Sequence, residues 1–389
     1  MLPSDFSDRK SGRAVRTPQG YWAFAPDPLP PRIEISMSTA RALSEADRGL
    51  GELAGCARNL PNPHLLIGPF IKREAVLSSR IEGTQASLSD LFLFEAREGA
   101  RATLPPDTVE VANYVAALEH GLERLQSLPL SLRLIREIHA RLLTGVRGAM
   151  HTPGEFRTSQ NWIGRAGCDL AEAVYVPPAV DDMKAALADF EGYLHAPTDL
   201  PPLVRQAIIH YQFEAIHPFL DGNGRIGRLL IIFLMCCDEL LPHPLLYLSA
   251  FFEQRRQQYY DSLLRISQRG EWIPWIEFFL RGVATQARDA LWRADRLLAL
   301  RQSYRERMQT ARSSALLLQM VDDLFALPMV SVPTVARKLK ITQRAVRMNV
   351  RKLVDAGILA EITGRERYRM FVASEILEAI QMEKPRALE

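Results

Sequence analysis

Residues 217–228 read His217-Pro218-Phe219-Leu220-Asp221-Gly222-Asn223-Gly224-Arg225-Ile226-Gly227-Arg228. Upstream, apolar residues recur at helical spacing over residues 203–216, and residues 229–235 form a strongly apolar run downstream. The downstream run is too short to cross a bilayer, so it predicts a buried core helix. We therefore expect the quoted stretch to be a loop between two helices.

The start of the second helix is expected to form an anion site. Gly222-Asn223-Gly224 lies where free backbone N–H groups and the positive end of the helix dipole point outward. Glycines let a phosphate approach the backbone closely. Asp221 is placed to hold a divalent cation, Mg²⁺, because a hard cation prefers carboxylate and phosphate oxygens.

Arg225, Arg228 and His217 complete this expected site. The two arginines lie three residues apart on one helical turn, so both can bind one phosphate chain through their forked donors. The imidazole of His217 can take a proton from an incoming hydroxyl near neutral pH. The alternative interpretation is a capped helix start with solvated arginines and a loop histidine.

The whole stretch resembles the Fic family motif, His-x-Phe-x-(Asp/Glu)-Gly-Asn-Gly-Arg-x-x-Arg, at every specified position. Fic proteins usually transfer AMP from ATP to a Ser, Thr or Tyr hydroxyl of a target protein. The resemblance implies that His217 is the catalytic base on that hydroxyl and that Asp221 is the Mg²⁺ ligand. It also implies that Asn223 contacts the α-phosphate region.

The resemblance further implies how the rest of the nucleotide is bound. Gly222 and Gly224 would form the anion hole, while both arginines would hold the β- and γ-phosphates. The full set of nucleotide-binding residues that it implies is Gly222, Asn223, Gly224, Arg225, Gly227, Arg228, Trp162, Ile163, Tyr259 and Tyr260.

A second stretch, residues 78–83, ends a predicted helix that is broken near Gly83. As plain sequence it is a helix end with a glycine C-cap and a solvated Glu82. It also resembles the Fic inhibitory motif, (Ser/Thr)-x-x-x-Glu-(Gly/Asn), which starts here at Ser78. This resemblance implies that Glu82 pairs with Arg228 and auto-inhibits the enzyme, because a carboxylate competes with the γ-phosphate for one guanidinium.

Residues 153–178, the flap segment, break the helical pattern. Two short β-like runs with a glycine-containing connection predict a hairpin. It resembles the Fic flap, which aligns the target protein's backbone by strand addition. Trp162 and Ile163 would then line the nucleotide pocket or clamp the target residue, although Trp162 could simply anchor the hairpin.

Three other features have local interpretations. Tyr259 and Tyr260 are either core aromatics or, as the resemblance implies, contacts that stack on adenine. His139 on a predicted helix is taken as a structural histidine. Residues 1–31 are interpreted as an extended arm that packs a few aromatic residues onto the body, with a disordered tail as the alternative.

The composition is ordinary for a globular protein of two or three domains. The chain has 389 residues, with 47% hydrophobic and 24% charged residues, and a net charge of +3. That charge is too small to argue for nucleic acid by itself. The four cysteines form no Cys-x-x-Cys pair, which argues against zinc and thioredoxin-like sites and suits a reducing cytoplasm. No signal peptide or membrane span is expected.

From residue 314 the pattern changes to helix, helix-turn-helix and two strands with a turn near Gly364, which resembles a winged helix. All charged residues from Arg337 to Lys352 are basic. Arg344, Arg347 and Arg351 could form one face of a recognition helix that binds DNA. The alternative is a winged helix used for protein contact or dimerisation.

We therefore predict a mainly α-helical fold with a helical Fic core, a small β-hairpin flap and a C-terminal winged helix-turn-helix domain. The expected divisions are an N-terminal region with the inhibitory helix (1–105), the catalytic core (106–300) and the winged helix (301–389). The resemblance implies a protein adenylyltransferase with a target protein along the flap. We also expect a cytoplasmic location, from the cysteine usage, and a homodimer. The alternatives are a nucleotide-sensing DNA-binding regulator, or a Fic enzyme that uses another donor or removes AMP.

Overall fold

Helices account for most of this chain, as predicted, and a computed structural model describes residues 1–6, 11–58, 64–96, 105–146, 152–165, 167–309, 315–364 and 369–383. After a short 3-10 turn at Pro3–Asp5, the helices of the larger part are α1 (Met37–Arg58), α2 (His64–Ile81), α3 (Leu88–Ala96), α4 (Pro106–Arg124), α5 (Leu132–Leu142), α6 (Val180–His195), α7 (Pro202–Ile216), α8 (Asn223–Cys237), α9 (Ser249–Gln254), α10 (Arg256–Arg269) and α11 (Trp272–Met308).

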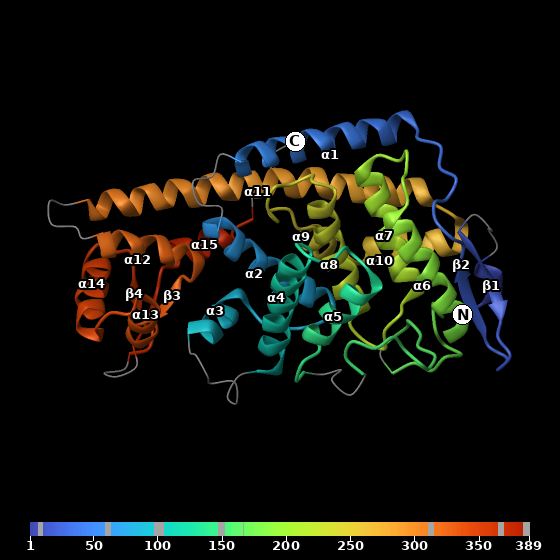
Figure 1. Ribbon diagram of the computed structural model, residues 1–389, viewed down its shortest axis with the longest axis horizontal. Coiled ribbons are helices and arrows are strands. Elements are labelled where there is room, and N and C mark those ends of the chain that lie inside the picture. The colour runs from blue at the N-terminus through green and yellow to red at the C-terminus, as the bar shows by residue number, and fades with distance from the viewer. Residues whose placement is uncertain are drawn as a thin grey trace.

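The two central helices α7 and α8 are buried along almost their whole length. Both bury residues on every side, polar ones such as His210 and Arg228 included, so other elements enclose them. In Figure 1, α1 and α11 lie side by side along one edge of the molecule, while the other helices pack beneath them. The loop between α7 and α8 is therefore held between two buried helices.

The N-terminal arm is a hairpin rather than a single extended segment. Strands β1 (Gly12–Arg16) and β2 (Trp22–Pro26) pair antiparallel with each other. Phe24 is fully buried and its ring lies 5.9 Å from that of Tyr175 in the flap segment. The arm thus packs an aromatic residue onto the body, as expected, and does so next to the predicted flap.

The flap segment contains less β-structure than predicted. Its two runs meet in a single antiparallel bridge between Ile163 and Tyr175, with the Ile163 N–H donating to the Tyr175 carbonyl over 2.8 Å. The N–H of Phe24 in β2 donates to Val176 over 2.8 Å. Pro177 and Pro178 follow at once and donate no backbone hydrogen bond, which limits a longer ladder.

The C-terminal part is a winged helix, as predicted. It comprises α12 (Ala315–Ala326), β3 (Met329–Ser331), α13 (Val332–Leu339), α14 (Gln343–Asp355), β4 (Ala360–Glu361) and β5 (Met370–Val372). The strands pair in the order β3-β5-β4. Ser331 and Thr342 cap α13 and α14 through their side-chain oxygens. The predicted turn at Gly364 continues into residues 365–368, which lie outside the described residues.

Two features at this end were not predicted. Helix α15 (Ser374–Gln381) follows the wing and packs against α11 and α2. Helix α11 continues to Met308, so a division at residue 300 would cut through it. One continuous apolar core includes residues of both the larger part and the winged helix.

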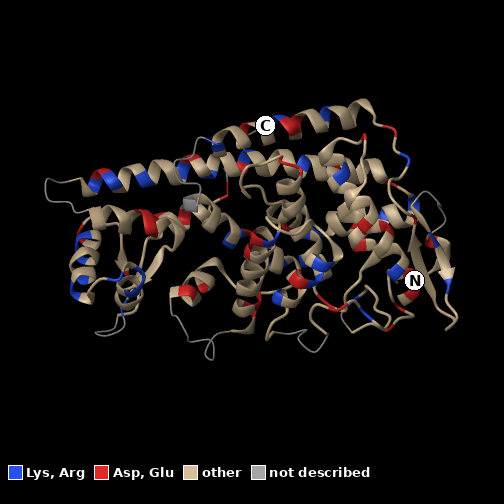
Figure 2. Cartoon of the chain, viewed as in Figure 1, with Lys and Arg blue, Asp and Glu red and all other residues tan. Residues whose placement is uncertain are grey.

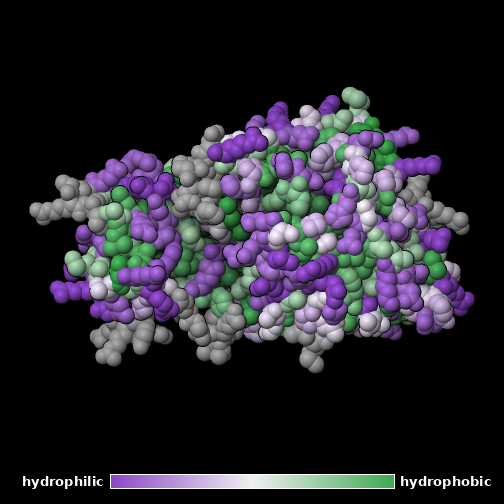
Figure 3. Space-filling model, in the orientation of Figure 1, coloured by the Kyte–Doolittle hydropathy of each residue, from purple (hydrophilic) through white to green (hydrophobic). Residues whose placement is uncertain are grey.

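The outer surface mixes polar and apolar residues on the face shown in Figure 3. Within the described ranges, no helix is both long and apolar enough to cross a membrane.

Candidate active site

His217 stands at the end of α7, where the chain turns into the loop. Its backbone is left-handed (φ 48°) and its N–H donates to the Phe213 carbonyl over 3.0 Å. Nδ1 lies 3.2 Å from the Glu214 carbonyl, which can only accept, so Nδ1 carries the proton. Burial lowers the pKa of His217 to about 4, although the bond to Glu214 opposes this shift. The ring is thus neutral near pH 7, with Nε2 able to accept a proton.

The flap segment holds the loop by side chains that the sequence reasoning did not single out. Arg157 is 1% exposed and donates to the His217 carbonyl over 3.0 Å. Asn161 donates to the Phe219 carbonyl over 2.7 Å. Asn223 brackets Phe219 from the other side, accepting from its N–H and donating to its carbonyl, each over 2.8 Å. The Asn223 side chain therefore braces the loop at the start of α8.

His139 is a structural histidine, as expected. Its ring stacks on Phe219 at 3.7 Å between centroids. Nδ1 accepts from the Gly154 N–H over 2.8 Å, so Nε2 is the donor to the Asp221 carbonyl, 3.0 Å away. Burial lowers its pKa to about 4. This histidine fixes the backbone at the predicted metal ligand.

Asp221 and Arg225 lie together at the start of α8. Gly222 adopts a left-handed conformation (φ 82°) that favours glycine, and its N–H donates to Asp221 Oδ1 over 2.6 Å. Arg225, with a side chain 5% exposed, lies 3.4 Å from Asp221 Oδ1 and 3.7 Å from Glu110 Oε2. The Asp221 side chain is 40% exposed, so it can also contact a solvated cation.

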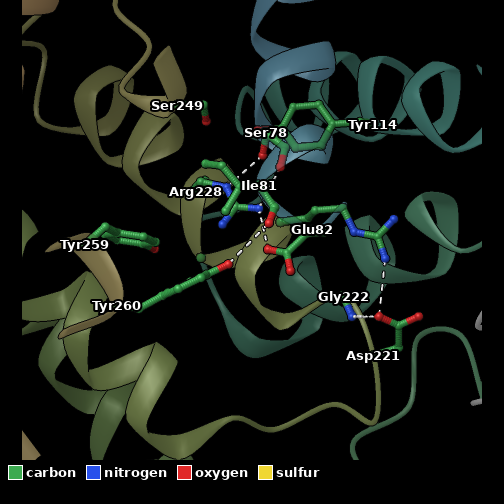
Figure 4. A network of polar contacts seen from close by, with 12 residues as sticks. Ser78, Ile81, Glu82, Tyr114, Asp221, Gly222, Arg228, Ser249, Tyr259 and Tyr260 are labelled. Carbon is green, nitrogen blue, oxygen red and sulfur yellow. Dashed lines mark hydrogen bonds and ion pairs between the residues drawn. The ribbon is translucent and has the colours of Figure 1, made fainter. Parts of the chain in front are cut away.

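The predicted contact between Glu82 and Arg228 is present, and Figure 4 shows Arg228 pointing at Ser78 and Glu82 at the end of α2. Arg228 Nη2 lies 2.7 Å from Glu82 Oε1 and 3.1 Å from the Ser78 carbonyl, and Nε donates to Ser78 Oγ over 2.8 Å. Burial alone would raise the pKa of Glu82, yet Arg228 lowers it overall. Glu82 is therefore an ionised partner of a buried arginine.

The approach of Glu82 also explains Gly224. A Cβ at this position would lie 2.4 Å from Glu82 Oε1 and 3.0 Å from Arg228 Nη1. Arg228 Nη1 is buried and makes no hydrogen bond to any described residue. A buried guanidinium N–H without an acceptor fits a site that receives an anionic oxygen. The arginine thus has capacity for a ligand beyond Glu82.

Glu214 is a partly buried acid with a buried Oε1 that the sequence reasoning missed. A Cβ at Gly227 would lie 2.2 Å from its Oε1, and this oxygen makes no hydrogen bond within the described part of the chain. Burial raises the pKa of Glu214 to about 8, with Arg228 opposing the shift and Glu82 adding to it. Its position three residues before His217 gave no signal, because an acid near a helix end is usually solvated.

The predicted aromatic contacts separate into core and surface. Tyr259 is 1% exposed, its hydroxyl lies 2.8 Å from His210 Nε2 and its ring stacks on Phe252. Tyr260 is 38% exposed and donates to the Ile81 carbonyl over 3.3 Å, so it touches the end of α2. Trp162 and Ile163 are also partly exposed, at 40% and 42%.

A neutral imidazole, a carboxylate, two buried arginines and a helix N-terminus thus converge on one loop. Among the described residues, no group of three or more His, Cys, Asp or Glu side chains could hold a metal by itself. A Mg²⁺ ion here would be held by Asp221 together with substrate phosphates, which is its usual coordination in phosphoryl-transfer sites. The arrangement suits attack of a hydroxyl on a phosphorus atom.

Three family models match this chain. They are the Fic/DOC family N-terminal model over residues 40–123, the Fic/DOC family model over residues 129–235 and an HTH DNA binding domain model over residues 317–371. The HTH match covers α12 through β5 and agrees with the winged helix.

Curated relatives bear the name protein adenylyltransferase Fic. The protein from Drosophila grimshawi is 32% identical over 156 residues, which cover 40% of this chain and 29% of that protein. The protein from Culex quinquefasciatus is 32% identical over 151 residues, covering 38% and 27%. The match spans less than a third of the length of these relatives.

Solved structures share the fold. A Fic family protein from Desulfovibrio desulfuricans G20 aligns with a TM-score of 0.57 at 20% identity, over 89% of this chain and 98% of that one. Fic-1 from C. elegans aligns with a TM-score of 0.50 at 21% identity, over 68% and 73%. With the signature loop in place between α7 and α8, and two consecutive family models along residues 40–235, this region of the chain belongs to the Fic/DOC family.

Proposed function

We propose that this protein transfers AMP from ATP to a Ser, Thr or Tyr hydroxyl of a target protein and of itself. The observation that carries this proposal is the placement of neutral His217 beside the first turn of α8, where Arg225 and Arg228 are buried. The names of the curated relatives point to the same activity. Mg²⁺ held at Asp221 would neutralise phosphate charge when bound.

The chain's own groups account for the chemical step. Nε2 of His217 takes the proton of the target hydroxyl, and the oxygen forms a bond to the α-phosphorus. The bond from the α-phosphorus to the bridging oxygen breaks, and pyrophosphate leaves. Backbone N–H groups of α8 and the two arginines stabilise the developing negative charge.

In the state described here, Glu82 opposes this reaction. Its carboxylate occupies Nη2 of Arg228 at 2.7 Å, and Ser78 occupies Nε at 2.8 Å. A triphosphate would have to displace these partners, or bind with its α-phosphate out of line for attack. Small misplacements of reacting groups cost a large part of the rate. We therefore propose auto-inhibition by Glu82.

The test is incubation with α-labelled ATP and Mg²⁺ of the wild type, Glu82→Gly and His217→Ala, followed by intact-mass analysis. We expect one added AMP in Glu82→Gly, a weak signal in the wild type and none in His217→Ala. If all three lack the adduct while they still bind ATP, the proposed transfer is wrong. An equal adduct in all three would show that His217 is not the catalytic base and that Glu82 does not inhibit the transfer.

The partners follow from the exposed parts of the site. We propose that a target protein binds its backbone along the flap segment near Trp162 and Ile163, which are partly exposed. Tyr260, rather than buried Tyr259, is the better candidate for stacking on adenine. A homodimer is the proposed assembly.

A second function, DNA binding by the winged helix, is favoured by α14. Arg344, Arg347 and Arg351 are exposed on this helix, whose basic residues Figure 2 shows at the far end of the molecule. The HTH match covers the same helix. The test is retention on nonspecific duplex DNA, which should weaken steeply with salt if phosphates are contacted. Retention unaffected by Arg344→Ala with Arg347→Ala would refute this role for α14.

A further inference from the structure

The winged helix lies directly against the inhibitory helix. Helix α12 packs on α2, and strand β3 packs on α3, the helix that follows the turn at Glu82. Buried side chains of α12 belong to the same apolar core as Phe70 and Ile71 of α2. Figure 1 shows α2 between the winged helix and the catalytic helices. The winged helix, called the winged-helix module below, therefore packs directly against α2, the helix that ends next to Glu82.

Lys72 of α2 is the polar centre of this contact. Its side chain is only 12% exposed. The ammonium lies 3.3 Å from the carbonyl of Ala326, the last residue of α12, where a cation complements the helix dipole. It also lies 3.2 Å from Glu95 of α3 and 5.3 Å from the ring of Phe92. One side chain thus joins α2, α3 and α12.

Thr334 ties the winged helix to the other side of the Glu82 turn. Its hydroxyl, in the first turn of α13, donates over 3.1 Å to the carbonyl of Ala96, the last residue of α3. Lys72 fixes α2 and Thr334 fixes α3. The helices on both sides of the turn that carries Glu82 are therefore anchored to the same module.

Helix α2 is firmly held between this contact and the active site. Glu74 is buried and accepts hydrogen bonds from Tyr114, over 3.1 Å, and from Ser249. Arg73 lies 3.5 Å from Asp289 of α11. Four residues beyond Glu74, Ser78 begins the contacts to Arg228. Packed helices shift as units rather than bend continuously. A displacement of α2 at Lys72 therefore also moves Ser78 and Glu82 relative to Arg228.

We propose that the winged-helix module holds α2 and α3 in the position that keeps Glu82 on Arg228, so that the module regulates AMP transfer. This inference rests on the proposed function. The exposed basic face of α14 belongs to the same module, and duplex DNA bound there would act on Arg228 through Lys72 and Thr334. By linkage, ATP and DNA would change each other's affinity by the same factor.

The test is a double-mutant cycle in which self-modification with α-labelled ATP is measured. Lys72→Met keeps the apolar stem of the side chain and removes the ammonium. We expect at least a roughly fivefold rise in AMP transfer when Glu82 is present, the lower end of usual coupling effects. In a Glu82→Gly background, Lys72→Met should add nothing. Thr334→Val, which leaves the Ser331 cap of α13 in place, should behave in the same way.

Lys338→Met is the matched control. Lys338 lies in the same module, is 52% exposed and pairs with Asp323 over 3.1 Å. This variant should transfer AMP at the wild-type rate. Circular dichroism on each variant identifies any that fails to fold. If Lys72→Met fails to fold, the result of Thr334→Val decides the test.

The outcomes separate the two proposals. An inactive Glu82→Gly variant would refute the proposed function itself. An active Glu82→Gly, with Lys72→Met and Thr334→Val both at the wild-type rate, would overturn the coupling alone. A rise in Lys72→Met that is equally large in the Glu82→Gly background would overturn it too, because the effect would not pass through Glu82.

Discussion

At the scale of single residues, the guanidinium of Arg228 lies near two carboxyl groups in very different states. Glu82 is ionised and directly bonded to it, whereas Glu214 is partly buried with a raised pKa and a buried oxygen to which no described residue donates a hydrogen bond. The first could be predicted from the sequence, because both motifs resemble family signatures. The second could not, since nothing in the residues around 214 shows that Gly227 will close over its side chain.

Glu82→Gln tests the charge state of the inhibitory contact. The pKa of the Glu82 carboxyl is lowered from 4.5 in the folded chain, so its contribution to stability is present above about pH 4.5 and is lost as pH falls through the folded pKa. The side chain is 37% exposed, so solvent screens the pair, and we expect the wild type to melt about 2 °C or less above the variant at pH 7. Thermal melts from pH 7 to pH 3 check this. A difference that stays constant over the whole range would contradict an ionised Glu82.

Glu214→Gln should have the opposite pH dependence. The folded pKa of Glu214 is about 8, above its ordinary value of 4.5, so the wild type loses stability as pH rises from about 4.5 to about 8. The neutral glutamine avoids this loss, and we expect a gain of about 1–3 kcal/mol at pH 8, as for a poorly satisfied buried group. Denaturant unfolding at pH 5 and pH 8 measures it. A variant that is less stable than the wild type at pH 8 would show that the carboxylate has a partner.

At the scale of elements, the helices followed from the sequence, whereas the pairing partners of the segments over the site did not. The apolar spacing over residues 203–216 and the apolar run at 229–235 predicted α7 and α8, because these patterns are local. The N-terminal hairpin and the flap depend on pairs distant in the chain, such as the Phe24 N–H with the Val176 carbonyl. The loop between α7 and α8 likewise depends on distant contacts, because His139 and Arg157, which hydrogen-bond its backbone, lie far upstream in the chain.

Arg157→Met tests whether these braces position His217. Arg157 donates to the carbonyls of His217, Ser159 and Pro178, and its removal takes one donor from each of these groups. We expect a loss of stability of about 1–3 kcal/mol and, in the Glu82→Gly background, a fall in kcat with little change in ATP affinity. Single-turnover transfer and ATP titration separate the two effects. Arg133→Met, at a side chain 72% exposed that pairs with Glu137 on the surface of α5, is the control and should change neither.

At the scale of the whole molecule, α11 and α15 join the two modules. Helix α11 runs along α1 and continues to the winged helix. Its Arg293, 1% exposed, donates to the carbonyls of Ala379, Ile380 and Met382 around the end of α15. The sequence suggested a boundary near residue 301 from its charged composition. That composition reflects instead a helix whose Arg301 and Arg305 pair with Asp322 of α12.

This continuity predicts that the chain unfolds as one unit, and its tryptophans make the prediction easy to test. All five lie in the larger part, at residues 22, 162, 272, 275 and 292, whereas far-UV circular dichroism reports helices of both modules. Because the apolar core is continuous, we expect thermal transitions by tryptophan fluorescence and by circular dichroism to coincide. In Arg293→Met, which removes the donor to three carbonyls, both transitions should move down together. A dichroism transition without a fluorescence counterpart in the wild type would mean that the winged helix melts alone and cannot hold α2 in place.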